Sequence, residues 1–263
     1  MNFTQEQQKA ASILWEAQNS GELCSPVREI IGEADLESAY TVQRINTGLK
    51  LKRGEQIIGA KIGLTNEVVQ KQLGVNQPDY GVLTDAMLFN ESNRIPWSVL
   101  HQPKVEAEIA FVLGQDITEG DITLSDLKAK IASAVASIEV VGSRIKDWNI
   151  RITDTIADNA SASHFVLGAE EKPLSEIDLE GCKMVMKRGE EIVSEGFGKA
   201  CMGNPLNALL WLAQTMVKLG TPLRAGDVVL AGALGPMVSV QPGDEFNATI
   251  EGLGTVSVSF DRL

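Results

Sequence analysis

The 263-residue chain is long enough to bury a substantial core, in one large domain or two small ones. A formal charge of −12 and an aromatic content of 5% argue against binding to nucleic acid or an anionic membrane, since both need a basic surface. The three cysteines form no Cys-x-x-Cys pair and only two histidines are present, so any bound metal must rely on oxygen ligands.

The first residues have no basic segment leading into an apolar run, and no later apolar run reaches 18 residues. We therefore expect a cytoplasmic protein with no membrane partner. A small anionic substrate is compatible with the negative charge if a local cation offsets the field.

Helical periodicity dominates the N-terminal part of the chain. Apolar residues at helical spacing predict one helix over residues 4–20, ending at Gly21, and a second over residues 36–52. We assign residues 1–75 to a helical N-terminal region and residues 76–263 to a β-rich catalytic core. We expect the two to form one continuous structural unit.

A lysine interrupts the next apolar, glycine-rich run, which predicts a strand over residues 56–64. Lys61 either extends from a strand edge to water or is a buried cation that serves an anionic group. A short helix is predicted at 65–72, followed by turn chemistry at 77–81. Asp79, within that turn, either bonds its own backbone or joins a site.

Two glutamates enter the predicted strand 103–112. Side chains alternate along a strand, so Glu106 and Glu108 share one face about 7 Å apart. Two carboxylates at the start of a buried strand repel each other and lose hydration, which costs free energy. A lysine, an arginine or a divalent cation between them relieves that cost. The alternative is a solvated strand end beside a turn.

A third glutamate lies in an apolar setting further along the chain. The spacing predicts a helix over 123–136 and a strand over 137–144 that carries Glu139, although periodicity alone also fits a continued helix. Residues 154–163 are short and polar, and predict a loop leading into a strand at 165–168. This loop either presents Asp158, Asn159 and Ser161 to a pocket or satisfies its own turns.

The C-terminal part predicts strands joined by turns, with one helix over 205–219. The strands are expected at 181–187, 191–194, 227–230 and within 245–260. The glycine-rich run 231–236 is no nucleotide loop, because it lacks Gly-x-Gly-x-x-Gly. It indicates either a close backbone approach to a ligand or a packed turn.

Several stretches together resemble the hydratase and decarboxylase branch of the fumarylacetoacetate hydrolase superfamily. The resemblance covers nearly the whole chain and is specific as a set. It rests on KIGLT at 61–65, QPDYG at 77–81, EAEIA at 106–110, EVVGSRIKDW at 139–148, DTIADNAS at 154–161, AGDVVL at 225–230, PGD at 242–244 and IEGLG at 250–254.

The resemblance implies an α+β fold whose core is a rolled, mixed β-sandwich. It implies a site for Mg²⁺ or Mn²⁺ formed by three glutamates, with two catalytic residues and a substrate-binding set beside it. The metal ligands are Glu106, Glu108 and Glu139; the catalytic residues are Lys61 and Asp79; the substrate-binding residues are Lys61, Ser161, Leu83 and Gly235.

The loop GALGPMV at 232–238 is most similar to the hydratases of the branch, which implies addition of water to 2-hydroxypenta-2,4-dienoate in aromatic catabolism. The wider superfamily often has Gly-Thr-Pro where this chain has Gly232-Ala233-Leu234, so hydrolase activity is not transferred.

One alternative is a decarboxylase of 4-oxalocrotonate type, for which Arg144, Lys146 and Arg151 are candidate cations for a second substrate carboxylate. The other is a non-catalytic partner subunit. The resemblance also implies a homo-oligomer and association with neighbouring pathway enzymes.

Overall fold

The N-terminal helices pack into a layer of their own. In the computed structural model, which describes residues 3–66, 70 and 77–263, α1 (Gln5–Ser20), α2 (Arg28–Ile31) and α3 (Leu36–Lys52) pack with α6 (Ile152–Ala157). Thr4 caps α1 in a capping box with Gln7, and Gly21 ends it in a left-handed conformation. The two helices predicted from periodicity are confirmed.

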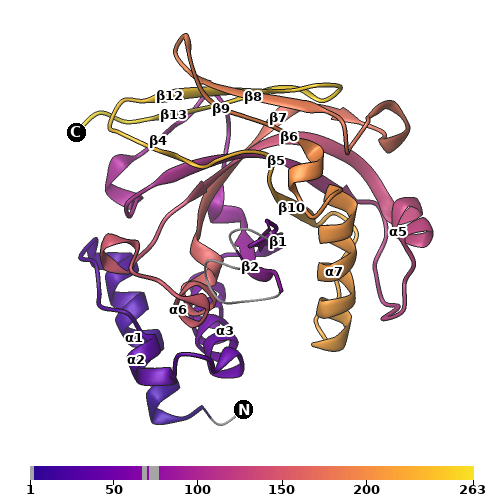
Figure 1. The fold of residues 1–263 in the computed structure, drawn as a ribbon. Helices are drawn as coiled ribbons and strands as arrows, with labels where there is room; N and C mark the ends of the chain where they lie inside the picture. The colour runs from indigo at the N-terminus through magenta and orange to yellow at the C-terminus, as the bar shows by residue number, and fades with distance from the viewer. Residues whose placement is uncertain (1–2, 67–69, 71–76) are drawn as a thin grey trace.

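A large mixed sheet forms the centre of the molecule (Figure 1). Among the described residues its strand order is β2-β1-β10-β5-β6-β7-β3, with β11 on β5. The strands are β1 (Ile57–Gly63), β2 (Asp79–Thr84), β3 (Leu88–Phe89), β5 (Lys104–Leu113), β6 (Ile131–Val141), β7 (Ala162–Lys172), β10 (Val228–Ala233) and β11 (Val238–Ser239). β2 also contacts β7, so the sheet curls upon itself.

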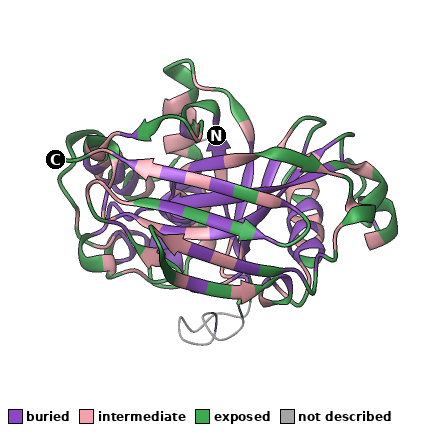
Figure 2. Ribbon diagram, turned by 90° about the horizontal axis from the view of Figure 1, so that it is seen from above, coloured by how far each residue is buried: buried purple, intermediate pink, exposed green. Residues whose placement is uncertain are grey.

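A second sheet, in the order β4-β13-β12-β8-β9, covers one face of the first (Figures 1 and 2). Its strands are β4 (Arg94–Ile95), β8 (Lys183–Arg188), β9 (Glu191–Phe197), β12 (Glu245–Ile250) and β13 (Gly254–Phe260). Buried and exposed residues alternate along β12, as expected of a strand with one solvated face. The remaining α-helices among the described residues are α5 (Leu124–Lys130) and α7 (Pro205–Lys218), and single 3₁₀ turns lie at Asp85–Met87, Trp97–Val99, Lys146–Trp148, Asn159–Ser161, Leu174–Glu176 and Gly198–Ala200.

The two faces of the large sheet have different contents. On β5, Ile109 and Phe111 face the second sheet and pack in the main core with Met184 and Phe246. The opposite, inner face carries Glu106 and Glu108 together with a smaller apolar cluster of Leu83, Met87, Ala110, Val135, Ala162, Phe165, Val228 and Leu230. The predicted α+β class with a rolled, mixed β-sandwich is confirmed. No helix among the described residues has the length and hydropathy to cross a membrane.

Three local predictions were wrong. The helix predicted over 123–136 ends at Lys130, because β6 begins at Ile131 and is buried on both faces, which hides strand alternation. The turn predicted at 77–81 gives way to β2 at Asp79. The loop predicted at 154–163 is replaced by α6 and a 3₁₀ turn, whose short polar side chains are buried and bonded.

The strands predicted at 56–64, 103–112 and in the C-terminal part are confirmed, as is the helix over 205–219. The helix predicted at 65–72 falls for most of its length outside the described residues, and so does the boundary between 75 and 76. That division into regions stays a prediction; β1, on its N-terminal side, pairs with β10 of the core.

Candidate metal and substrate site

Three glutamates converge on the inner face of the large sheet. Glu106 of β5 lies directly opposite Glu139 of β6 in the antiparallel register, and Glu108 is two residues along the same face. One carboxylate oxygen from each lies within 4.8 Å of the others. Glu108 and Glu139 are each 1% exposed, so this is no solvated strand end.

Lys61 approaches the glutamates from β1. It is 4% exposed, and its Nζ lies 3.1 Å from Glu139 Oε1 and donates a hydrogen bond to Ala160 O at 3.0 Å. Burial alone lowers the pKa of Lys61, but Glu139, Glu106 and the other nearby carboxylates outweigh it and raise the pKa above its ordinary value. Of the two alternatives from the sequence, the structure shows the buried cation.

Asp79 begins β2 on the same inner face, opposite Gly63 of β1. Neither of its oxygens has a hydrogen-bond partner among the described residues. A Cβ at Gly63 would lie 2.2 Å from Asp79 Oδ1, so only glycine leaves room for this carboxylate. Burial raises the pKa of Asp79 to about 6, with Lys61 opposing the shift and Glu139 adding to it.

We call the group formed by one lysine and four acidic residues the carboxylate cluster: Lys61, Asp79, Glu106, Glu108 and Glu139. Several of its carboxylate oxygens have no hydrogen-bond partner among the described residues. Glu108 Oε2 accepts from Gly232 N at 2.9 Å, but Glu108 Oε1 and Glu139 Oε2 have no hydrogen-bond partner within the part of the chain that the structure describes. Burial raises the pKa of Glu106 to about 7 and that of Glu108 well above its usual range, and Glu139 reinforces both shifts.

Buried polar groups are nearly always bonded, so convergent unpaired carboxylate oxygens indicate a missing positive partner. Three carboxylates with no histidine suit a hard divalent cation that prefers oxygen ligands. The donor set formed by Glu106, Glu108 and Glu139 therefore fits such an ion.

The other predicted substrate-binding residues lie in different settings. Ser161 is buried in the turn after α6, with its Oγ 3.2 Å from Thr155 Oγ1. Leu83 is 1% exposed on β2 and belongs to the apolar cluster of the inner face.

Gly235 packs against the second sheet. A Cβ there would lie 2.6 Å from Met184 Cε and 2.8 Å from Glu195 O. Of the two interpretations of the run 231–236, the surroundings of Gly235 match the packed turn.

Sequence reasoning missed the residues that act through backbone or through absence of a side chain. Gly232 presents its N–H to Glu108, Gly63 makes room for Asp79, and Ala160 supplies its carbonyl to Lys61. The available signal was glycine within a strand pattern, which often marks a close approach of two groups.

The chain is similar to known proteins in sequence and in structure. The family model described as fumarylacetoacetate (FAA) hydrolase C-terminal matches residues 59–260. The chain is 54% identical to the TodF product hydratase of Pseudomonas putida, over 97% of this chain and 95% of that protein. It is 53% identical to the 2-keto-4-pentenoate hydratase of Paraburkholderia phymatum, over 96% of each.

The structure resembles that of 4-oxalocrotonate decarboxylase from Pseudomonas putida G7, solved with magnesium and adipate. The TM-score is 0.92 at 31% identity, covering 98% of this chain and 100% of that one.

Proposed function

The chain belongs to the fumarylacetoacetate hydrolase family, and from this premise we propose that it is a divalent-metal-dependent hydratase of 2-hydroxypenta-2,4-dienoate. The product is 4-hydroxy-2-oxopentanoate. The observation that carries the proposal is the convergence of three glutamates, two of them buried and Glu106 half-buried, with the buried Lys61, in a chain about half identical to named hydratases over nearly its whole length.

The reaction needs proton transfer at two stages. Ketonisation of the dienol moves its hydroxyl proton to C5 and gives the 2-oxo-3-enoate; water then adds its oxygen at C4 and a proton at C3. Lys61, held by Glu139 and Ala160 O, presents a buried cation to the substrate oxygens. Asp79, with its pKa near 6, can hold or release a proton at its carboxylate near neutral pH.

Glu106, Glu108 and Glu139 would hold the divalent cation, which we propose to be Mg²⁺ or Mn²⁺. When bound, such an ion supplies Lewis-acid polarisation of oxygen ligands. The protein's own part is to hold these carboxylates on adjacent strands, with Glu108 and Glu139 buried and Glu106 half-buried.

A second candidate is decarboxylation, because the decarboxylase structure is so similar. That reaction needs a cation for the second carboxylate of its substrate. Arg144 is instead bonded to Asp158 beneath the N-terminal helices, while Lys146 and Arg151 are exposed. None of the three contacts the carboxylate cluster, which favours the hydratase. The intact cluster also argues against a non-catalytic subunit.

A spectrophotometric assay of dienol loss by the purified chain tests the proposal. We expect turnover with added Mg²⁺ or Mn²⁺, abolition by chelator, and 4-hydroxy-2-oxopentanoate as product. Glu106→Gln should remove most of the rate, while Glu191→Gln, an exposed surface control, should not. Turnover of Glu106→Gln near the wild-type rate would refute the metal site, and CO₂ release from 4-oxalocrotonate would favour the decarboxylase.

The homo-oligomer, the cytoplasmic location and association with pathway enzymes stay predictions. Sedimentation of the purified chain tests the first of these directly.

A further inference from the structure

An unusual turn delivers the carbonyl that binds Lys61. Asn159, Ala160 and Ser161 are consecutive non-glycine residues with φ of 56°, 51° and 58°. This left-handed region is sparsely populated by such residues and persists only where the surroundings impose it. Something must therefore hold the turn in place.

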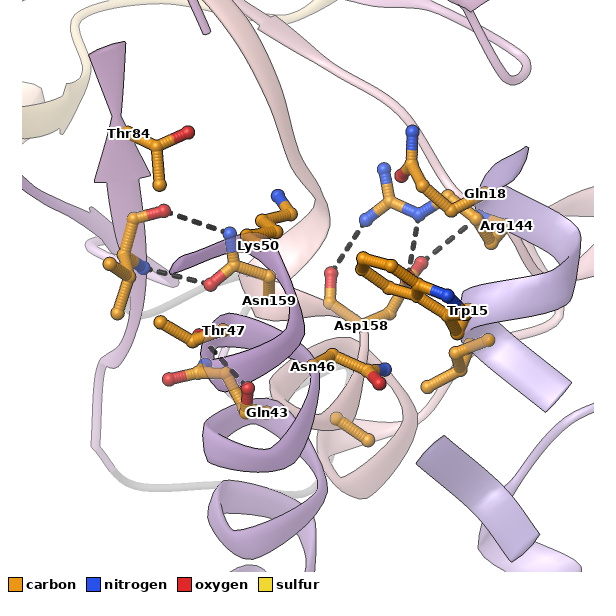
Figure 3. Close-up of a pocket in the computed structure, with 13 residues that line it drawn as sticks. Trp15, Gln18, Gln43, Asn46, Thr47, Lys50, Thr84, Arg144, Asp158 and Asn159 are labelled. Atoms are coloured by element: carbon orange, nitrogen blue, oxygen red, sulfur yellow. Dashed lines mark hydrogen bonds and ion pairs between the residues drawn. The ribbon is translucent and has the colours of Figure 1, made fainter. Parts of the chain in front are cut away.

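The side chain of Asn159 fastens the turn to the neighbouring strand. Its Oδ1 accepts from Val82 N at 2.8 Å, and its Nδ2 donates to Val82 O at 2.9 Å. Figure 3 shows these two bonds between the Asn159 amide and the strand that carries Thr84. Both hydrogen-bonding groups of the side chain are used on one residue of β2, as in a strand pair.

The turn is also fitted closely against β2. A Cβ at Gly81 would lie 2.3 Å from Asn159 O, and Gly81 is the register partner of Lys61. The clamp at Val82 is thus one residue from the strand position that faces Lys61. With the turn held there, Ala160 O accepts from Lys61 Nζ at 3.0 Å, while Glu139 lies 3.1 Å from the same Nζ.

We propose that Asn159 is a positioning residue for Lys61: its side-chain clamp on Val82 sets the Ala160 carbonyl that, with Glu139, fixes the Lys61 ammonium. The expected effect on catalysis rests on the proposed hydratase function. The expected effect on the position of the Lys61 ammonium does not. Asn159 contacts no metal ligand in the described structure, so its effect is separable from metal binding.

Asn159→Gly tests the clamp, because glycine adopts the same positive φ and removes only the side-chain bonds. We expect kcat to fall about 10- to 100-fold, as for a small misplacement of a catalytic group, with unchanged Mn²⁺ affinity in a titration. Asn247→Ala, which removes an exposed asparagine bonded to Ser257, is the matched control and should keep wild-type values.

A crystal structure of Asn159→Gly provides a readout independent of activity. We expect the contact between Lys61 Nζ and Ala160 O to lengthen beyond hydrogen-bonding distance. Retention of that contact, or of wild-type kcat in an active enzyme, overturns the proposal; so does a parallel loss of Mn²⁺ affinity. If the wild type lacks hydratase activity, the proposed function fails, and the crystal structure alone decides the clamp.

Should Asn159→Gly fail to fold, Asn159→Asp replaces it. The aspartate keeps the acceptor for Val82 N and loses the donor to Val82 O, so it should show the same pattern with a smaller loss of kcat. Wild-type kcat in a folded Asn159→Asp with the contact intact would overturn the proposal.

Discussion

The molecule contains two groups of buried charges that differ in how their oxygens are paired. In the arginine pairs, Arg28–Asp154 and Arg144–Asp158, each aspartate oxygen accepts at least one hydrogen bond. In the carboxylate cluster, both oxygens of Asp79, one oxygen of Glu108 (Oε1) and one of Glu139 (Oε2) accept none among the described residues.

The arginine pairs tie separate segments to α6 and the turn that follows it. Arg28 of α2 binds Asp154 of α6 at 2.5 Å and also donates to Asn149 O. Arg144 Nε donates to Asp158 Oδ1 at 2.6 Å, and the Arg144 guanidinium also reaches Asp158 O (Figure 3). These contacts fix α6 and the turn that follows it.

The difference shows that burial of charge does not by itself identify a site. Burial raises the pKa of Asp158 against the opposing effect of Arg144, just as it raises that of Asp79 against Lys61. What separates them is the hydrogen bonding: a satisfied group holds the fold, whereas an unsatisfied one is costly unless it binds something.

The largest expected effect is on stability, at the arginine pairs. Asp158→Ala leaves Arg144 buried without its partner and removes the acceptor for Arg144 N, so the free energy of unfolding should fall by about 3–5 kcal/mol. Urea denaturation measures this. A loss below about 1 kcal/mol is typical of exposed ion pairs. It would contradict the view that the buried arginine pairs stabilise the fold.

The carboxylate cluster should respond in the opposite way. Glu108→Gln keeps an acceptor for Gly232 N but removes a charged ligand, so activity should fall by about 100-fold or more, while stability in chelator stays equal or rises. Mn²⁺ should raise the unfolding free energy of the wild type by about 2.7 kcal/mol at a hundredfold excess over Kd, and that of the variant by less. Thermal unfolding with and without Mn²⁺ provides the test; equal stabilisation of both proteins would contradict the ligand assignment.

The sequence predicts the parts of this site that depend on local spacing. Glu106 and Glu108 lie two residues apart on a strand, so their shared face followed from alternation. The pairing of Glu106 with Glu139 depends on a register between strands far apart in sequence, which no local pattern specifies. The residues marked Glu139 only as a third glutamate in an apolar setting, and the family resemblance made it a third ligand.

The largest misjudged segment was 154–163. Short polar residues usually indicate a loop, but Asp154 and Asp158 are buried here because arginines from outside the segment satisfy them. Such partners cannot be paired from the sequence alone. The helix predicted across 131–136 was wrong for the same kind of reason, since burial on both faces of β6 comes from its neighbours.

A pH series sharpens the contrast at Asp79. Its folded-state pKa of about 6 lies above the ordinary 3.8, so the ionised carboxylate destabilises the fold; the penalty is absent below pH 4 and complete above about pH 6. In chelator, Asp79→Asn should therefore match the wild type at pH 4 and exceed its unfolding free energy at pH 8 by at most roughly 3 kcal/mol. Urea denaturation at both pH values tests this, and a variant less stable than wild type at pH 8 would contradict it.

The smallest effect is expected at an exposed pair with the same chemistry as the arginine pairs. Arg94 and Glu245 form an ion pair whose side chains are 44% and 62% exposed. Water solvates both charges when the pair is broken, so Glu245→Ala should change the free energy of unfolding by less than about 1 kcal/mol. Measured beside Asp158→Ala under the same conditions, it separates the contribution of burial from that of the ion pair itself. A loss as large as that of Asp158→Ala would mean that the ion pair itself, and not its burial with satisfied hydrogen bonds, determines how much free energy of unfolding is lost.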